Sequence, residues 1–192
     1  MTALSQAVAY LTSTQTSPPA AAAVVADLLL AEKAAKSSPA TYPALWGTWR
    51  LGFVTGTRKA RQRAGVTLGA GRFLPRWLNI TITYEPTEPT ATGDRAQVNN
   101  RVRCGPFDLQ VSGPTRFWPQ QRILAFDFTR LSLKLGKQTL YSGFIRQGQG
   151  REAEFYQQAL KDQAFFKYFL IRPDCIAARG RGGGLALWVA DR

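Results

Sequence analysis

Hydrophobic and polar residues alternate with a period of two along most of the chain after residue 43. Such runs are typical of antiparallel strands with one dry face and one wet face. Short turns with Gly or Pro separate the runs, so the pattern predicts roughly eight to ten strands, enough to close an antiparallel β-barrel. The apolar positions of the four clearest runs are Trp49, Leu51 and Phe53; Leu78, Ile80, Ile82 and Tyr84; Phe107, Leu109 and Val111; and Leu131, Leu133 and Leu135.

The first 40 residues have a helical pattern instead. Ser17 can cap a helix whose first turn holds Pro18 and Pro19, where a missing N–H has no cost. A further helical turn is predicted over residues 3–11, and a short helix or open loop over residues 147–163. We therefore expect an N-terminal helical segment, residues 1–40, and a barrel domain, residues 43–192. The segment either packs over one end of the barrel or docks a partner. The apolar stripe of the main helix is Val24, Val25, Leu28, Leu29 and Ala31.

The inward-facing side chains of the barrel are the candidate ligand site. They either line a cavity for an apolar small molecule or fill the barrel, and both arrangements need the same alternation. Asn100 interrupts one inward row, so it either fixes the polar end of a ligand or bonds a backbone group at a bulge. The apolar candidates are Leu51, Phe53, Leu78, Ile80, Ile82, Val98, Val102, Leu109, Val111, Phe126, Leu140 and Phe144.

The formal net charge of +13 predicts an anionic partner. Its densest part lies in the long loop of residues 57–72, where several basic residues could hold the protein at an anionic membrane surface. Flanking apolar residues such as Phe73 and Trp77 could dip into the headgroup region. A purely solvated loop is the alternative, and nucleic acid is not expected because the aromatic strand signature of RNA-recognition folds is missing. The basic candidates are Arg58, Lys59, Arg61, Arg63, Arg72 and Arg76.

The composition argues against an enzyme or a metal protein. The chain has no His, the commonest general base and metal ligand, and only two Cys. We expect Cys104 and Cys175 to be reduced, with a single bridge between them as the alternative. No catalytic motif stands out, and we predict no cofactor. No Lys or Arg precedes Lys33, so no signal peptide is expected.

Two short stretches at opposite ends of the strand region could join the ends of a barrel. The first is Leu45-Trp46-Gly47-Thr48-Trp49-Arg50-Leu51, and the second runs from Ile176 through Arg179-Gly180 and a Gly-rich turn to Trp188. We expect Trp49 to plug one end of the barrel while the Arg179 guanidinium stacks on an indole face.

Three parts of the chain resemble the plastid lipid-associated protein (fibrillin) family of photosynthetic organisms, in its cyanobacterial type. They are the first of these stretches, residues 99–107, and the block from Phe169 to Gly180 with the Gly-rich turn that follows it. The resemblance covers about residues 43–190, and its motif positions are Gly47, Trp49, Asp174, Arg179 and Gly180. It implies a lipocalin-like barrel that binds lipids, carotenoids or isoprenoid quinones. It also implies a location on the cytoplasmic side of thylakoid membranes or at lipid bodies, or in a plastid if the source is a eukaryote.

The leading hypothesis is therefore a non-enzymatic protein that binds a hydrophobic small molecule at a membrane surface. The alternative is a scaffold with a filled barrel that recruits a protein partner, an enzyme of isoprenoid metabolism. A third hypothesis is a lyase that attaches a tetrapyrrole, which requires a thiol or acid facing the cavity, at Cys104 or Asp127.

Overall fold

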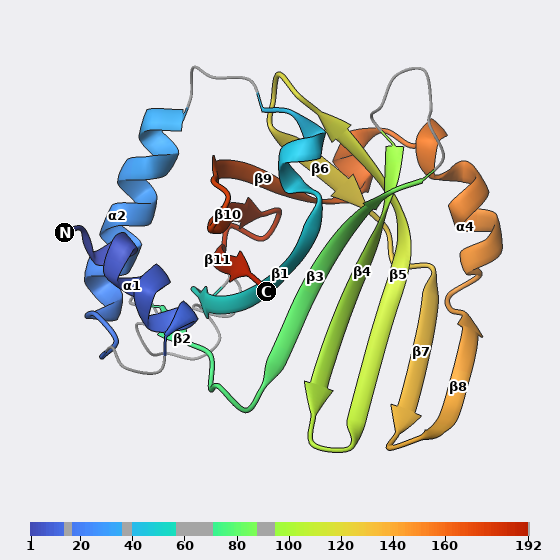
Figure 1. Ribbon diagram of the computed structural model, residues 1–192. Coiled ribbons are helices and arrows are strands. Elements are labelled where there is room, and N and C mark those ends of the chain that lie inside the picture. Colours follow the sequence, from blue (N-terminus) through green and yellow to red (C-terminus); the bar gives the residue numbers. More distant parts are fainter. Residues whose placement is uncertain (14–16, 36–39, 57–70, 88–94, 192) are drawn as a thin grey trace.

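The computed structural model describes residues 1–13, 17–35, 40–56, 71–87 and 95–191. Within these residues, eight antiparallel strands pair in a closed ring (Figure 1). The first strand pairs with the last, which closes the barrel. The predicted fold class, a mainly β lipocalin-like barrel with an N-terminal helical segment, is confirmed. In order around the ring the strands are β1 (Gly47–Val54), β3 (Asn79–Pro86), β4 (Arg95–Cys104), β5 (Phe107–Trp118), β6 (Ile123–Phe126), β9 (Ala164–Ile171), β10 (Cys175–Gly180) and β11 (Leu185–Ala190).

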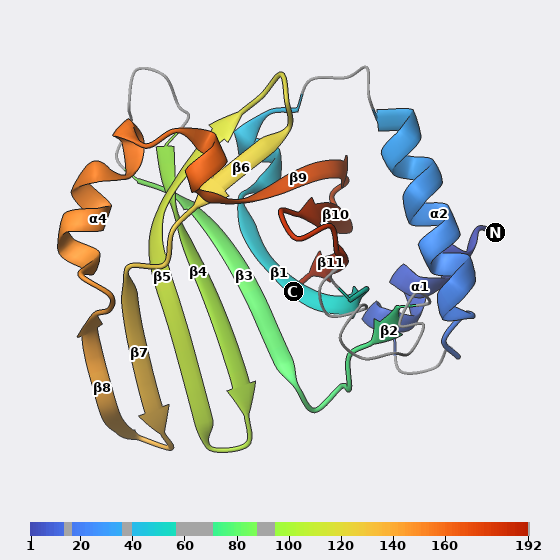
Figure 2. The ribbon, with the colours of Figure 1, turned by 180° about the vertical axis from the view of Figure 1, so that it is seen from behind.

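Two further strands, β7 (Arg130–Leu135) and β8 (Gln138–Phe144), extend the sheet outside the ring. They do so because β5 changes partner along its length: its first half pairs with β7, and its second half pairs with β6. The lower halves of β3, β4 and β5 together with β7 and β8 form an open sheet, which we call the wing (Figures 1 and 2). Its free end, the tip, consists of the turns at residues 75–78, 104–107 and 135–138.

The link between β6 and β7 crosses β5 at Gly113. The backbone N–H of Asp127 donates to the carbonyl of Pro114 at 3.2 Å, and that of Thr129 donates to Ser112 at 2.9 Å. A Cβ at Gly113 would lie only 2.0 Å from the Asp127 carbonyl oxygen. Glycine at this position therefore lets the chain pass from the barrel to the wing.

The helices α1 (Ala3–Thr12) and α2 (Ala21–Ala34) pack on the outside of the barrel wall, against β9, β10 and β11, and not over an end of the barrel (Figure 1). The backbone N–H of Leu4 in α1 donates to Asp27 in α2 at 2.9 Å. The predicted cap at Ser17 is wrong, since α2 begins at Ala21 without a side-chain cap. Of the predicted stripe, Val24 and Leu28 are buried, whereas Leu29 is 46% exposed.

Short helical turns complete the fold. Residues 148–162 form α4 (Gly148–Glu154) and the 3-10 turns η4 (Phe155–Gln157) and η5 (Leu160–Asp162), so the predicted short helix is confirmed. The turn η2 (Tyr42–Leu45) leads into β1, and β2 (Arg72–Phe73) pairs with the end of β1.

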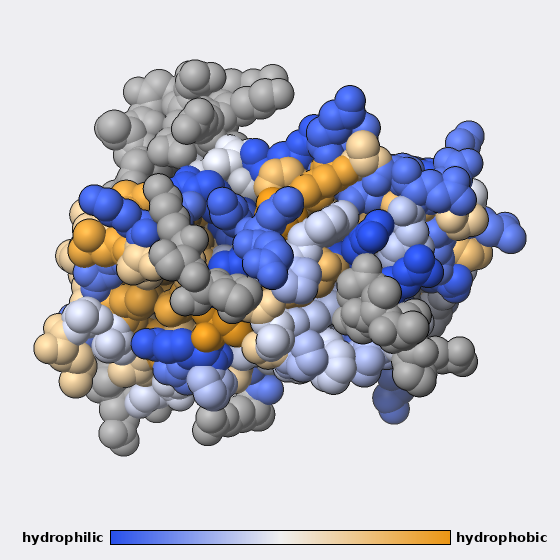
Figure 3. Space-filling model, turned by 90° about the horizontal axis from the view of Figure 1, so that it is seen from above, coloured by the Kyte–Doolittle hydropathy of each residue, from blue (hydrophilic) through white to orange (hydrophobic). Residues whose placement is uncertain are grey.

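From above, hydrophobic surface is more extensive on the α2 side than at the α4 end (Figure 3). Among the described helices, none combines the length and the apolar character that a membrane crossing needs.

A β-bulge in β1 changes which face of the sheet its side chains occupy. The pairing with β11 shifts between Leu51 and Phe53, at Gly52. Trp49 and Leu51 therefore face the barrel interior, but Phe53 turns outward and is buried against the helices. The prediction that Phe53 lines the interior is wrong, because a bulge breaks the period of two on which the prediction rested.

Candidate functional site

Large aromatic side chains occupy the interior of the closed barrel. The Trp188 ring lies 5.5 Å from the Phe166 ring and 6.3 Å from the Tyr168 ring. The Tyr84 and Tyr168 hydroxyls are hydrogen-bonded to each other at 2.7 Å, and burial raises the pKa of both. The buried interior also includes Tyr42, Leu45, Trp49, Ile82, Ala96, Val98, Phe117, Leu124, Phe126, Ile176 and Ala178.

The inner face of the barrel continues without a break onto the wing. Residues that are directly paired across neighbouring strands share a face, so the register gives the rows of this face. The row next to the barrel core is Ile82, Asn100, Val111, Leu131 and Gly143; the second row is Ile80, Val102, Leu109, Leu133 and Tyr141; and the row at the tip is Cys104, Phe107, Leu135 and Gln138.

Several side chains of these rows are exposed in the described structure. Leu109 is 37% exposed, Tyr141 42%, Leu135 39% and Phe107 54%. The opposite face of the wing is polar, as in the directly paired Gln110 and Ser132. A contiguous apolar face beside a polar one is typical of a binding surface.

Asn100 is the polar residue of the row next to the barrel core. Its neighbours in the row are Ile82 and Val111, and its neighbours along β4 on the same face are Val98 and Val102. The Asn100 Oδ1 atom is buried, and within the described residues it accepts no hydrogen bond. An unpaired buried acceptor costs about 1–3 kcal/mol. Both pairings of β4 run through Asn100 in regular register, so the alternative of a bond to the backbone at a bulge is wrong.

The apolar candidates predicted from the sequence lie in the barrel core, on the wing, or off the inner face. Two of them do not reach the inner face: Phe53 packs against the helices, and Phe144 lies on the polar face of the wing, 4.3 Å beneath the Arg130 guanidinium. Leu140 is the extra residue of a bulge in β8 and is 50% exposed. The barrel core takes Leu51, Ile82, Val98 and Phe126, and the wing takes Ile80, Val102, Leu109 and Val111, with Leu78 directly before β3.

The predicted basic contacts are only partly described. Arg58, Lys59, Arg61 and Arg63 lie outside the described residues, as does most of the loop. Arg72 is exposed in β2. Arg76 donates to the carbonyls of Tyr10 at 3.1 Å and Ser13 at 2.9 Å, so it ties the approach to β3 to the end of α1.

The motif residues have structural contacts. Gly47 adopts a φ of 118°, in the region that favours glycine, and Trp49 donates from Nε1 to the Leu45 carbonyl at 2.7 Å. Asp174 pairs with Arg172 at 3.1 Å, and Gly180 is the last residue of β10. The expected stacking of Arg179 on an indole is wrong. Its guanidinium forms a two-pronged ion pair with Glu32 of α2, with Nε 2.7 Å from Oε1, and it also donates to the Gly183 carbonyl at 2.7 Å.

The two cysteines are free. Burial raises the pKa of the Cys175 thiol to about 11, although the Arg172 guanidinium lies 3.0 Å from its Sγ. Cys104 lies in the tip row. Asp127, the other residue considered for a lyase, is ion-paired with Arg151. In the part of the chain that the structure describes, no three His, Cys, Asp or Glu side chains cluster as a metal site requires.

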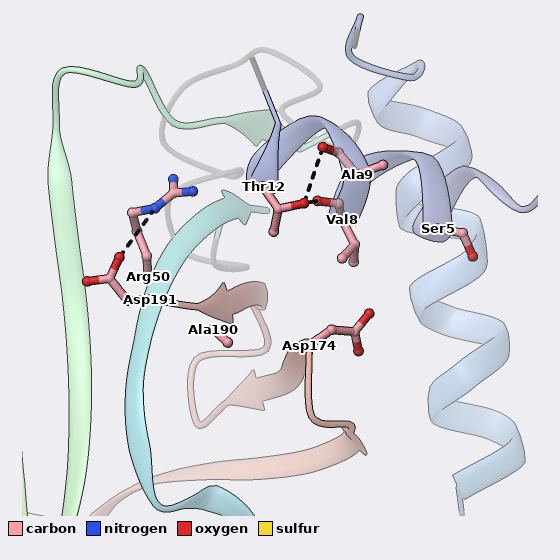
Figure 4. Close-up of a pocket in the computed structure, with 8 residues that line it drawn as sticks. All are labelled: Ser5, Val8, Ala9, Thr12, Arg50, Asp174, Ala190 and Asp191. Atoms are coloured by element: carbon pink, nitrogen blue, oxygen red, sulfur yellow. Dashed lines mark hydrogen bonds and ion pairs between the residues drawn. The ribbon is translucent and has the colours of Figure 1, made fainter. Parts of the chain in front are cut away.

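A separate pocket of about 660 Å³ opens between α1 and the barrel (Figure 4). Its charged lining residues already have partners: Arg50 lies 3.9 Å from Asp191 and donates to the Leu11 carbonyl, and Asp174 is bound by Arg172. The hydroxyl of Thr12 donates to the Val8 carbonyl at 2.9 Å. The charged groups of this pocket are therefore already paired within the protein, and the inner face of the wing is the stronger candidate site.

No protein-family model matches the chain, and no curated protein matches it either. The resemblance to the plastid lipid-associated proteins therefore stays a prediction.

Proposed function

We propose that the protein binds a hydrophobic small molecule on the inner face of the wing, next to the packed core of the barrel. The observation that carries the proposal is the incompletely covered second row: Leu109 and Tyr141 are exposed, and the half-buried Val102 and Leu133 are the directly paired neighbours of Leu109. An apolar chain laid over this row would cover surface that water now contacts, at about 25 cal/mol per Å². Lipids, carotenoids and isoprenoid quinones have such chains.

The first test is a matched pair of double variants. We expect Leu109→Asp with Leu133→Asp to weaken binding of the apolar fluorescent probe N-phenylnaphthylamine at least about tenfold, because the carboxylates would lose hydration beneath the ligand. The control is Gln110→Asp with Ser132→Asp, an adjacent and directly paired couple on the polar face. Probe titration of delipidated protein measures both. Equal weakening in the two variants, or no binding by the unaltered protein, would contradict the proposal.

The tip has the composition of a membrane-contacting edge. Trp77 is 69% exposed and Phe107 is 54% exposed. The basic residues Arg103, Lys134 and Lys137 lie at the same end of the wing. One acid, Asp108, lies among them, and the Arg101 guanidinium lowers its pKa by a hydrogen bond. Exposed aromatic rings beside cations suit the headgroup region of an anionic bilayer, where each cation contributes about 1 kcal/mol. We propose that the tip, and not only the basic loop, contacts the membrane.

Vesicle sedimentation tests this contact. Replacement of Arg103, Lys134 and Lys137 by Gln should reduce binding to phosphatidylglycerol-containing vesicles about a hundredfold, since three cations are removed. Replacement of the exposed Lys33, Lys161 and Lys167 by Gln removes the same charge elsewhere and should have a much smaller effect. If the two triple variants bind alike, the tip is not the contact.

The aromatic interior of the barrel favours a second candidate function, a scaffold that recruits a protein. The exposed apolar residues of the wing would then contact that partner protein, and the purified protein would bind no apolar probe. The probe titration separates the two functions.

A further inference from the structure

The position of Asn100 suggests what kind of ligand the wing selects. The residue lies at the border between the packed barrel core and the open wing: Val98, two residues before it on the same face, is fully buried, and Val102, two residues after it, is only partly buried. The register places its side chain among the apolar rows of the inner face. Within the described residues, the buried Oδ1 atom accepts no hydrogen bond.

Nearby polar groups on the barrel side have their own partners. The Tyr84 hydroxyl, one row deeper, is engaged by Tyr168 at 2.7 Å. The neighbouring Asn99 points to the other face, where its Oδ1 accepts from Gln110 at 3.1 Å. Asn100 therefore differs from both residues: its Oδ1 atom is a buried acceptor within the apolar inner face, and no donor among the described residues satisfies it.

We propose that Asn100 Oδ1 accepts a hydrogen bond from the head of the ligand, so that the wing selects apolar molecules with a hydroxyl or N–H at one end. This inference rests on the proposed function. The chain of the ligand then lies over the second row and the tip row, with its far end at the tip. Asn100 and Cys104 are four residues apart along β4, which corresponds to about 13 Å of strand. A terminal alcohol meets this requirement, and the matching methyl ether does not, because it can only accept.

The test compares tetradecanol with its methyl ether as competitors of bound N-phenylnaphthylamine. For the unaltered protein we expect the alcohol to bind about tenfold more tightly than the ether, as one added hydrogen bond to an otherwise unpaired buried group implies. Asn100→Leu should abolish this preference and tighten binding of the ether. Asn99→Leu, a neighbouring change on the polar face, should leave the preference intact.

The outcomes distinguish the two proposals. If neither compound displaces the probe, and the probe itself does not bind, the proposed function fails. If both compounds bind equally well to the unaltered protein, the wing is a ligand site without the selectivity inferred here. If Asn100→Leu retains the tenfold preference, another acceptor holds the head and the role of Asn100 is overturned.

Discussion

Gly113→Ala is expected to lower the free energy of unfolding by about 3 kcal/mol, at the upper end of the cost of overpacking. The new Cβ would lie 2.0 Å from the carbonyl oxygen of Asp127 and 3.0 Å from Oγ1 of Thr129. Neither neighbour can withdraw easily, because backbone hydrogen bonds to Pro114 and Ser112 hold the crossing link on both sides. The substitution therefore strains the point at which the wing is attached to the barrel. Urea denaturation measures the loss.

Gly150→Ala is the matched control for this prediction. Gly150 lies in α4, and a Cβ there would meet nothing within 4 Å. Alanine in a helix is favoured over glycine, so this variant should be as stable as the unaltered protein or up to about 1 kcal/mol more stable. Equal stability of the two variants would show that the link over Gly113 moves aside freely.

The alternation of residues predicted the barrel but not the wing. Leu131, Leu133 and Leu135 have the same period of two as the strands that enclose the core, and they were expected to behave alike. Alternation shows that a strand has one apolar face; it does not show whether another layer covers that face. The wing exists because β5 is longer than the partner strands on its barrel side, and this depends on where Gly113 allows the chain to cross.

Local irregularities and distant partners account for the other differences. Phe53 was placed inside because nothing in the sequence marks Gly52 as a bulge rather than an ordinary small residue. Arg179 was paired with an indole because its true partner, Glu32, lies 147 residues away. Leu133 and Tyr141 were missed as site residues because their contribution appears only once the strand register is known. Gly105 and Gly136, both with positive φ, could have indicated the tip from the sequence, because they mark the turns of two hairpins that end there.

Trp188→Ala is expected to have the largest effect on stability, a loss of about 4 kcal/mol. Trp188 is 4% exposed and packs against the rings of Phe166 and Tyr168, so its removal leaves a large cavity in the barrel. Thermal unfolding should show a correspondingly lower midpoint. Trp77→Ala is the control, because that side chain is 69% exposed and surface substitutions usually change stability by less than about 0.5 kcal/mol.

Trp188→Ala also tests whether the ligand binds on the wing or in the barrel interior. If the ligand lies over Leu109 and Leu133, the cavity that Trp188→Ala leaves in the barrel core alters no contact on the wing. The affinity for N-phenylnaphthylamine should then stay unchanged within about twofold, under conditions where the variant is folded. Trp188→Phe, which removes less volume, gives the same comparison with a smaller loss of stability. If both variants gained probe affinity in step with the volume removed, the ligand would enter the barrel, and the interior would be the binding site in place of the wing.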